Sequence, residues 1–588
     1  MNKLKDTKMN IAIPIDTIKR IKSLLLISTI SVCIVSCSSR DEEVNTNTGN
    51  GGTPEGTVLT VSIDGIAAEG DITSLANASI NTKGINASPS MITLAKEKVV
   101  SAGGFDALIS AEGQINTENK PATTASISYT GAIAAVSKVP VNTGTLYRIL
   151  IYDETGTQLV SNTQASSGTN PNIKVDAGKK YKWYAFSINE SSVPNINAQG
   201  VISGSSLSNK DVLYSQGIID AQYGQNYLNV VFKRNTARIA LDLDTRGMFG
   251  TINNTTSVEL GTGTGSGFTS IIQTGDLNVF TGLYSNLQNV SPVTGSSMTN
   301  KAGAGGAAGA TKTAVFYTVR TANVPVNNLR IRLNQLDITM DNSSTRSFSN
   351  SIIPYNNTVI TPVLGNNYSL NARLIESGIR VKGLLWARTN LLYSSQSDAY
   401  RFRVDNEYSQ PDKDTEYWNW MSATPTGSSS DNVDPCTRVY PQGEWRMPTS
   451  AEFSNLGQPN DKNERYGLFL GASFSAVYNL DAGNSPNTSY PQYSQNLFLS
   501  FYGYRSTSWL GGTSISDSPG GIFLGALGSG SAYYWSSTDA GSGNANYWYM
   551  NYSRFAWFVG WSNAEIRSGA KSDGRMVRCV RSIPTPNT

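Results

Sequence analysis

The chain has 588 residues, 46 basic and 43 acidic side chains, four cysteines and no histidine. Charged residues make up only 15%, against roughly 25% in an average globular protein, which favours a β-rich secreted protein over a helical cytosolic enzyme. Without histidine the chain has no Ser-His-Asp or Cys-His machinery and no His-ligated metal site. The near-neutral net charge and the lack of a basic stripe argue against a nucleic-acid partner.

The N-terminus has the pattern of a targeting segment. Residues 1–22 hold six basic and two acidic side chains, and Ser23–Ser36 is a mostly apolar run of 14 residues. This order is typical of a secretory signal, because the run is shorter than the roughly 20 residues of a membrane-spanning helix. A buried core helix is the alternative. Residues 1–36 supply the positive charge, since the chain after them holds 40 basic and 41 acidic side chains.

The sequence Ile-Val-Ser before Cys37 resembles the lipobox of bacterial lipoproteins. The resemblance implies cleavage before Cys37 and acylation of its thiol and amine, with the outer membrane as partner through the lipid anchor. The acids Asp41, Glu42 and Glu43 resemble the surface-export signal of Bacteroidota lipoproteins, although a solvated linker is the alternative. We expect a surface-exposed outer-membrane lipoprotein, with residues 37–56 as a flexible tether.

From Thr57 onward, apolar and polar residues alternate with period two. Such alternation predicts antiparallel strands that bury one face. Leu146–Tyr152, a turn and Gln158–Val160 predict a hairpin. Ile173–Val175 followed by Lys180–Ile188 predicts a second hairpin.

The alternation continues in Ile239–Leu243 and Leu329–Met340. Many such strands, separated by loops of Gly, Asn and Ser, predict β-sandwiches. Pro89–Ala102 predicts a short helix in the first block. We place one sandwich at residues 57–208 and another at 209–376.

Three stretches, Leu146–Val160, Tyr181–Asn189 and Val230–Asp244, resemble the fimbrillin superfamily of Bacteroidota. The resemblance implies two tandem transthyretin-like β-sandwiches and other fimbrial subunits as partners. Some members of the family lose a first strand through Arg-specific cleavage. This chain has no Arg between residues 41 and 147, which argues against Arg-directed removal of a strand within the first sandwich. Proteolytic processing at Arg40 would only release the lipid.

Beyond residue 377 the composition changes, and nine of the ten tryptophans lie between Trp386 and Trp561. The motifs are DPC, WRMPT, YWSST and VRCVR, at Asp434–Cys436, Trp445–Thr449, Tyr534–Thr538 and Val577–Arg581. Their order resembles the Fibrobacter succinogenes major paralogous domain, a C-type-lectin-like module. The resemblance implies an α+β fold for residues 377–588 and a Cys436–Cys579 disulfide. The oxidising cell exterior also favours that pairing.

Local signals refine the picture of this C-terminal segment. Thr449 or Ser450 is expected to cap a helix, with Glu452 completing the cap. Most of the tryptophans are expected in the core. Trp509, Trp557 and Trp561 lie in or near stretches that contain Gly and Ser, and we predict them as platforms for sugar rings or protein.

Evidence for metal binding or catalysis is weak. Gln410–Asp412 and Gln458–Asn460 are similar to calcium-lectin tripeptides, but no Trp-Asn-Asp follows them. A calcium ion takes about six to eight oxygen ligands, and the sequence does not show whether any converge. No spacing of acids selects a glycosidase pair. We therefore predict no cofactor, no metal and no enzyme activity, and leave calcium open.

The sequence as a whole predicts a mainly β protein, with two tandem transthyretin-like β-sandwiches followed by an α+β C-type-lectin-like domain. The expected function is a non-catalytic surface lipoprotein, a fimbrial accessory or tip adhesin that binds a host or bacterial surface glycan or protein. Its C-terminal domain is expected to be a self-standing recognition module. The alternatives are an outer-membrane glycan-capture lipoprotein and a pilus anchor subunit.

Overall fold

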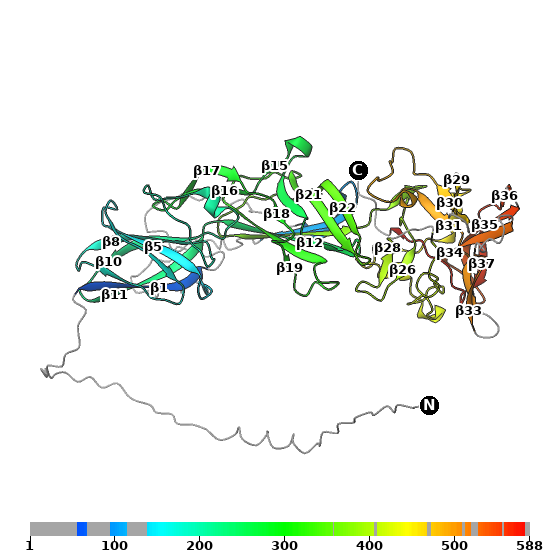
Figure 1. The fold of residues 1–588 in the computed structure, drawn as a ribbon, viewed down its shortest axis with the longest axis horizontal. Coiled ribbons are helices and arrows are strands. Elements are labelled where there is room, and N and C mark those ends of the chain that lie inside the picture. The colour runs from blue at the N-terminus through cyan, green and yellow to red at the C-terminus, as the bar shows by residue number, and fades with distance from the viewer. Residues whose placement is uncertain are drawn as a thin grey trace, which may run out of the picture. The chain divides into compact units, whose positions relative to one another are not determined.

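The computed structural model describes residues 56–67, 94–113, 138–356, 358–404, 409–466, 472–507, 512–518, 527–555 and 558–581 (Figure 1). All of these belong to one compact unit, Gly56–Thr588. Strands dominate, and α1 (Ser450–Leu456) is the single α-helix of the described residues, which confirms the mainly β class. No helix in the described part of the chain is long and apolar enough to cross a bilayer.

The first sandwich has one 8-stranded sheet in the order β4-β1-β11-β10-β8-β5-β6, with β7 paired to β1. Its strands are β1 (Thr57–Ala67), β4 (Lys138–Val139), β5 (Leu146–Asp153), β6 (Leu159–Ser166), β7 (Asn172–Val175), β8 (Lys180–Ser187), β10 (Leu213–Asp220) and β11 (Gln225–Arg234). Strands β10 and β11 pair only at Leu213↔Arg234 and Tyr214↔Lys233. The sheet therefore turns a corner there, and side chains from both halves share one apolar core.

One of the two predicted hairpins is confirmed. Strands β5 and β6 pair, and in their turn Asp153 Oδ1 accepts the N–H groups of Gly156, at 2.9 Å, and Gln158, at 3.0 Å. The second hairpin prediction is wrong, because β7 pairs with β1 whereas β8 pairs with β5 and β10. Ile173 and Trp183 enter the same core from opposite halves of the sheet, so the turn between β7 and β8 crosses the sandwich.

The second sandwich has two sheets, in the orders β19-β20-β12-β23-β3-β2 and β13-β21-β14-β15, with β18 paired to β14 and β22 to β21. The strands are β2 (Leu94–Ser101), β3 (Asp106–Gly113), β12 (Ala237–Gly247), β13 (Gly250–Ile252), β14 (Ser257–Thr262), β15 (Thr269–Ser270), β18 (Val293–Thr294), β19 (Thr299–Asn300), β20 (Thr311–Thr318), β21 (Leu329–Met340), β22 (Thr345–Tyr355) and β23 (Asn367–Ile375). The predicted alternation in β12 and β21 is confirmed, since their apolar side chains line the core.

Strands β2 and β3 come from the segment assigned to the first block but belong to the second sandwich. Strand β3 pairs with β23 from Asp106↔Ile375 to Gly113↔Tyr368, and β2 pairs with β3. The helix predicted within Pro89–Ala102 is therefore wrong for the described residues 94–101, because the strand ladder holds them extended. Strand pairing also crosses the predicted boundary near residue 208.

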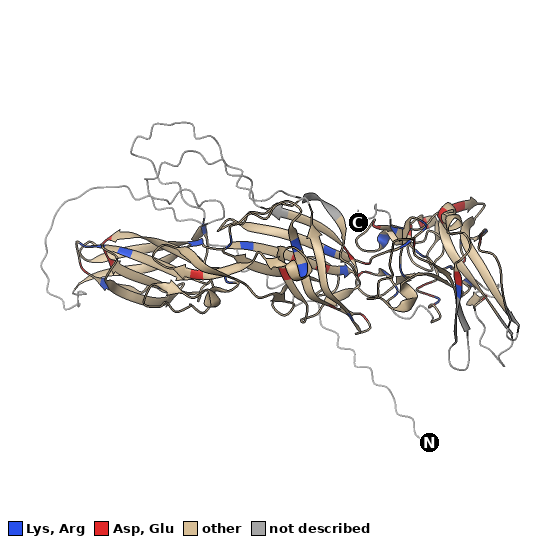
Figure 2. Cartoon of the chain, turned by 90° about the horizontal axis from the view of Figure 1, so that it is seen from above, with Lys and Arg blue, Asp and Glu red and all other residues tan. Residues whose placement is uncertain are grey.

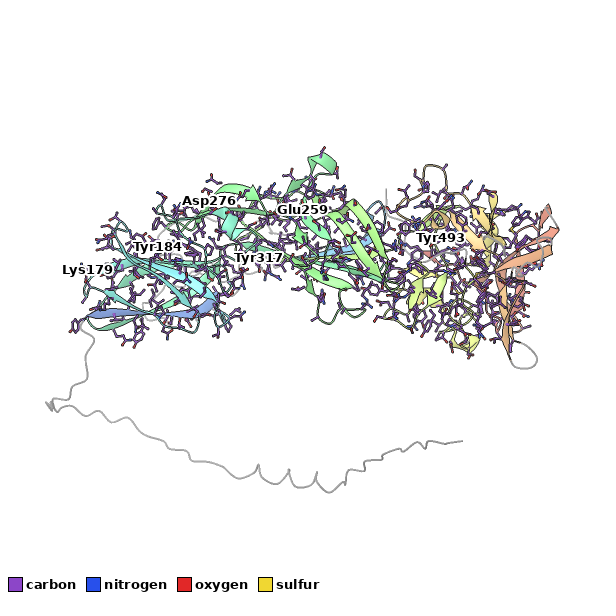
Figure 3. All side chains as sticks on the ribbon, in the orientation of Figure 1. Lys179, Tyr184, Glu259, Asp276, Tyr317 and Tyr493 are labelled. Atoms are coloured by element: carbon purple, nitrogen blue, oxygen red, sulfur yellow. A yellow bond between two sulfur atoms is a disulfide. The ribbon has the colours of Figure 1, made fainter. Side chains whose placement is uncertain are left out.

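A three-stranded sheet lies where the two sandwiches meet. It consists of β9 (Val201–Ile202), β16 (Gln273–Asn278) and β17 (Leu283–Asn289). Phe280, between β16 and β17, contacts Tyr152 of β5 and Tyr184 of β8, with ring centroids 5.3 Å apart in each pair. The β16–β17 hairpin therefore covers the outer face of β5 and β8, and Figure 3 labels Tyr184 and Asp276 on the two sides of this junction.

The C-terminal region, residues 377–588, contains several small sheets, ordered β24-β25-β38-β28, β26-β27, β29-β30-β31, β32-β33 and β34-β35-β36 with β37 on β35. The bounds are β24 (Ile379–Val381), β25 (Leu384–Trp386), β26 (Leu391–Tyr393), β27 (Tyr400–Phe402), β28 (Trp445–Arg446), β29 (Asp461–Tyr466), β30 (Ala472–Tyr478), β31 (Leu497–Ser500), β32 (Tyr504–Thr507), β33 (Thr513–Ser516), β34 (Leu527–Gly541), β35 (Asn544–Phe555), β36 (Phe558–Trp561), β37 (Glu565–Ala570) and β38 (Val580–Arg581). Loops make up much of the remainder, which is typical of a scaffold that presents a binding surface.

Helix α1 begins where the sequence predicts it. Thr449 is the N-cap, and its hydroxyl accepts the N–H of Glu452 at 3.2 Å. The Glu452 carboxylate accepts the N–H of Thr449 at 2.7 Å and completes a capping box. Burial raises the pKa of Glu452, but hydrogen bonds from Arg446 and Thr449 outweigh it, so the net shift is downward.

Candidate functional site

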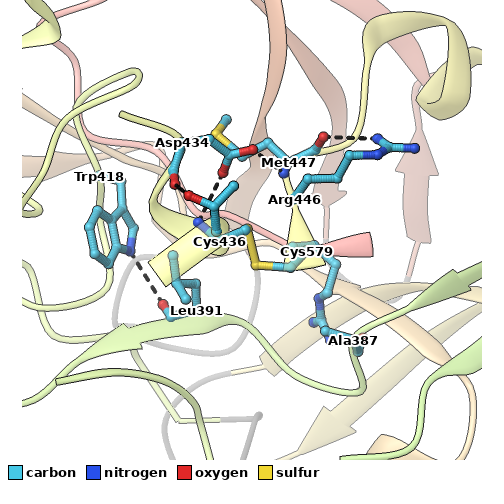
Figure 4. Close-up of a disulfide and its surroundings, with 10 residues drawn as sticks. Ala387, Leu391, Trp418, Asp434, Cys436, Arg446, Met447 and Cys579 are labelled. Carbon is cyan, nitrogen blue, oxygen red and sulfur yellow. Dashed lines mark hydrogen bonds between the residues drawn. A yellow bond between two sulfur atoms is a disulfide. The ribbon is translucent and has the colours of Figure 1, made fainter. Parts of the chain in front are cut away.

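Cys436 and Cys579 form the predicted disulfide, with Cα atoms 5.8 Å apart and both side chains fully buried (Figure 4). Cys436 lies in a 3₁₀ turn, Pro435–Arg438, that Asp434 caps. The Asp434 carboxylate accepts the N–H of Cys436 at 2.9 Å and that of Met447 at 2.7 Å. Burial raises the pKa of Asp434. These contacts fix the cystine to strand β28 as well as to its own turn.

The other half of the cystine precedes the last described strand. The Arg578 guanidinium is fully buried and donates to the carbonyl oxygens of Ala387, at 3.2 Å, and Phe498, at 2.7 Å. Strand β38 then pairs with β25 and β28. The cystine thus joins the end of the described chain to the turn that carries Cys436.

Buried polar contacts connect the C-terminal region to the second sandwich. Arg581 of β38 forms an ion pair with Asp106 of β3. The Tyr440 hydroxyl donates to Asp244 Oδ2 of β12 at 2.5 Å, and the Arg246 guanidinium lies 3.9 Å from the Tyr440 ring centroid. Arg246 also donates to Asp398, at 2.5 and 3.1 Å. Burial raises the pKa of Asp244, although the Tyr440 hydrogen bond opposes the shift, and it raises the pKa of Tyr440 to about 12.

A second group of charges surrounds Tyr490. Its hydroxyl donates to Glu376 at 2.5 Å, and Glu376 also forms an ion pair with Arg346 of β22. The Arg388 guanidinium lies 4.1 Å from the Tyr490 ring centroid. Burial and the adjacent Glu376 carboxylate raise the pKa of Tyr490 to about 12. Lys and Arg are interspersed with Asp and Glu on the strands, as Figure 2 shows.

Aromatic packing makes the two cores continuous. Phe249 of the second sandwich contacts Phe402 of β27 with ring centroids 5.8 Å apart, and Phe402 contacts Trp445 at 4.8 Å. One apolar cluster includes residues from β12, β21 and the C-terminal region. An independently folding C-terminal domain stays a prediction, but the structure gives this region a core shared with the second sandwich.

The predicted platform residues fall into two groups. Trp509 and Trp557 lie outside the described residues, as do Cys37 and Arg40. Trp561 is half-buried and packs against Phe501 and Tyr552, with centroids 5.7 and 5.8 Å apart. The Lys462 ammonium lies 5.5 Å from the Trp561 ring centroid. The tryptophans with less than 2% exposure are Trp386, Trp418, Trp445, Trp535 and Trp548.

Sequence reasoning missed the buried Arg575. Its guanidinium lies 3.9 Å from the Tyr547 ring centroid and 4.6 Å from that of Trp535. Burial lowers the pKa of Arg575, with Tyr547 and Asp573 opposing the shift. The ring faces supply the attraction that water would give an exposed cation. The sequence gives no local signal for this arrangement, because Arg575 and the rings come from different segments.

Two polar grooves flank the loop around Asn487, with volumes of about 210 and 350 Å³. Two of the side-chain amides that line these grooves already donate hydrogen bonds within the chain. The Asn487 amide donates to the carbonyl of Gly103 at 3.0 Å, and the Gln495 amide donates to that of Tyr490 at 2.9 Å. The grooves therefore belong to the contact between the second sandwich and the C-terminal region.

The two calcium-like tripeptides are hydrogen-bonded to their own chain. The Gln410 amide donates to the Tyr417 hydroxyl at 2.8 Å. The Gln458 amide donates to the carbonyl of Ala564 at 3.0 Å and accepts its N–H at 2.8 Å. Among the described residues, no group of three His, Cys, Asp or Glu side chains is arranged to hold a metal ion.

Comparisons with known proteins give fold likenesses alone. No family model matches the chain, and no curated protein matches it in sequence. A solved protein of Bacteroides fragilis assigned to cell adhesion is 11% identical, with a TM-score of 0.28, covering 54% of this chain and 96% of that one. The fimbrial anchor protein Mfa2 of Porphyromonas gingivalis is 13% identical, with a TM-score of 0.21, covering 37% and 76%.

A fimbrial assembly protein of Parabacteroides distasonis is 10% identical, with a TM-score of 0.19, covering 39% of this chain and 82% of its own. TM-scores below 0.5 do not establish a common function. The functional proposal therefore rests on the sequence and structure of this chain.

Proposed function

We propose that this chain is a non-catalytic cell-surface adhesin of the fimbrial type. A lipid on Cys37 anchors it to the outer membrane, and the C-type-lectin-like C-terminal region, residues 377–588, binds a surface glycan or protein. The sandwiches carry that region outward and contact other fimbrial subunits. The absence of histidine from the sequence supports a binding role, because the commonest general base is missing.

The construction of the C-terminal region is the observation that carries the proposal. Its base is fixed by the cystine, by the buried Arg578 and by contacts to the second sandwich. Loops, short strands and the longer hairpin of β34 and β35 make up the rest of the region. A rigid base beneath variable loops is the usual architecture of a recognition surface.

Trp561 is the described aromatic residue that best suits a contact with ligand. It lies at the end of β36, and its ring packs on the core through Phe501 and Tyr552 while part of the side chain stays exposed. A half-buried indole is held rigid while its exposed edge meets a ligand, so little side-chain entropy is lost on binding.

The test uses the full chain from residue 38, applied to arrays of bacterial and host glycans and of extracellular-matrix proteins. The proposal expects at least one ligand, with binding by Trp561→Ala weakened about tenfold or more, a loss of about 1.4 kcal/mol. Tyr223→Ala is the matched control, because Tyr223 is an aromatic residue of the first sandwich that is 90% exposed. Binding that persists in Trp561→Ala and fails in Tyr223→Ala would place the ligand on the sandwich instead.

The anchoring and location need separate measurements. Mass spectrometry of the mature N-terminus distinguishes an acylated Cys37 from a chain released at Arg40. Immunogold labelling at filament ends supports a tip adhesin, whereas label confined to filament bases supports an anchor subunit. Uniform label over the cell body supports a glycan-capture lipoprotein or a stand-alone adhesin.

A further inference from the structure

The cystine connects two segments that each contact the second sandwich. Four residues after Cys436, Tyr440 donates to Asp244 of β12 at 2.5 Å. Two residues after Cys579, Arg581 forms its ion pair with Asp106 of β3 and also donates to the carbonyl of Glu376. We propose that the Cys436–Cys579 bond locks the C-terminal region onto the second sandwich, and does not only stabilise the C-terminal region internally.

Strand β38 shows why a lock is needed. It is two residues long, and its ladder consists of Val580 opposite Trp386 and Arg446, and Arg581 opposite Trp445. Such a short ladder supplies few hydrogen bonds, so local fraying of β38 is opposed mainly by the contacts around it. The cystine immediately before it restrains that motion.

Fraying of β38 has a specific consequence for the second sandwich. Asp106 is 5% exposed and Arg581 is 3% exposed, so both charges are largely removed from water when the pair is intact, although Asp106 lines the groove of about 210 Å³. Withdrawal of Arg581 leaves Asp106 buried without its partner, and a buried unpaired charge is strongly destabilising. Water must then enter beside β3, which loosens its pairing with β23.

Tyr440 provides the same coupling on the other side of the cystine. The Arg246 guanidinium lies over its ring, and its hydroxyl donates a hydrogen bond to the buried carboxylate of Asp244. The turn that carries Cys436 is held by Asp434, which also binds Met447 next to β28. The cystine thus connects the Tyr440–Asp244 and Arg581–Asp106 contacts through the turn at Cys436 and the paired strands β28 and β38. The proposed lock does not depend on which ligand the protein binds.

The test measures hydrogen exchange in the full chain and reads strand β3, residues 106–113, which belongs to the second sandwich. In the double variant Cys436→Ala/Cys579→Ala, the lock predicts amide exchange in β3 at least about tenfold faster, while β8 of the first sandwich is unchanged. Arg581→Gln keeps the cystine and should reproduce the acceleration in β3. This second variant decides the matter if the double variant does not fold.

Met550→Ala is the control, since Met550 is fully buried on β35, which pairs with β34, β36 and β37. Val580 of β38 belongs to the same apolar cluster, but the strand ladder of β38 is formed with β25 and β28. This substitution destabilises the C-terminal region but keeps the cystine and the Arg581–Asp106 ion pair. The lock therefore predicts little change in the amide exchange of β3. Unchanged β3 exchange in the double variant or in Arg581→Gln would overturn the inference. Equal acceleration in Met550→Ala would overturn it too, because β3 would then simply follow the stability of the C-terminal region.

Discussion

The two junctions of this molecule both use aromatic contacts but differ in the ion pairs that cross them. Between the sandwiches, the β16–β17 hairpin places Phe280 against Tyr152 and Tyr184, beside buried Leu150 and Phe186. Between the second sandwich and the C-terminal region, the ion pairs Arg581–Asp106 and Arg246–Asp398 and a nearby cystine accompany the aromatic contacts. Apolar contacts tolerate small displacements, whereas buried charges require fixed partners. Removing one buried charge at the second junction should therefore cost more than removing one aromatic ring at the first.

The largest expected effect is at Arg581. Arg581→Met should lower the free energy of unfolding by about 3–5 kcal/mol, because Asp106 is left buried and unpaired. Denaturant unfolding of the full chain measures the loss. The double variant Arg581→Met/Asp106→Leu should recover much of it, since both charges are then gone. A double variant no more stable than the single one would show that the ion pair is not the cause.

At the first junction, Phe280→Ala should cost about 2–3 kcal/mol, somewhat less than a fully buried aromatic residue, because Phe280 is only partly buried. The loss should be the same at pH 5 and pH 8, because the lost contacts are aromatic and apolar. Melting at the two pH values tests this. A strong pH dependence would contradict the contrast between the junctions.

Tyr440→Phe tests the second junction through one hydroxyl. It should cost about 1–2 kcal/mol at pH 7, because a buried carboxylate loses a donor. Burial raises the pKa of Asp244, so the stability contributed by its protonated form is present at low pH and lost as the pH rises through the folded pKa. The cost of Tyr440→Phe should therefore be smaller at pH 4 than at pH 7. Equal costs at both would mean that Asp244 does not titrate in this range.

The smallest effect is expected at the capping box, away from both junctions. Glu452→Gln should cost about 1 kcal/mol at pH 7. The folded pKa of Glu452 is lowered, so its contribution is present above its unfolded pKa, about 4.3, and is lost as the pH falls through the folded value. The difference from the parent should shrink below pH 4. A difference that grows there would contradict the direction of the shift.

Local sequence patterns correctly predicted the helix cap and the β5–β6 turn, because both depend on residues close together in the sequence. The cap of Thr449 and Glu452 spans three residues, and the turn at Asp153 is closed by its own side chain. The sequence could not show that β7 and β8 face each other across a core, because a turn of the same composition closes a hairpin. The pairing of β3 with β23 joins residues such as Ser110 and Asn371, 261 positions apart, and no local signal reports it.

The candidate site divides in the same way. The resemblance of the late motifs predicted the Cys436–Cys579 bond, which the structure contains. It did not predict the contacts on either side of the bond, because Arg581 and Asp106 are 475 positions apart. The expectation of a self-standing C-terminal module came from composition, which does not show that Phe249 and Phe402 share a core. Contacts between separate parts of the fold leave no regular alternation of apolar and polar residues in the sequence, so the sequence alone does not predict them.

Calorimetric melting of the chain from residue 56 tests whether the cystine and the buried charges make the second sandwich and the C-terminal region one folding unit. In the parent protein these two parts should melt together. In Cys436→Ala/Cys579→Ala, the C-terminal region should melt first, in a separate transition at lower temperature. If the C-terminal region of the parent protein already melts separately, with the second sandwich unaffected, the two parts are not one folding unit.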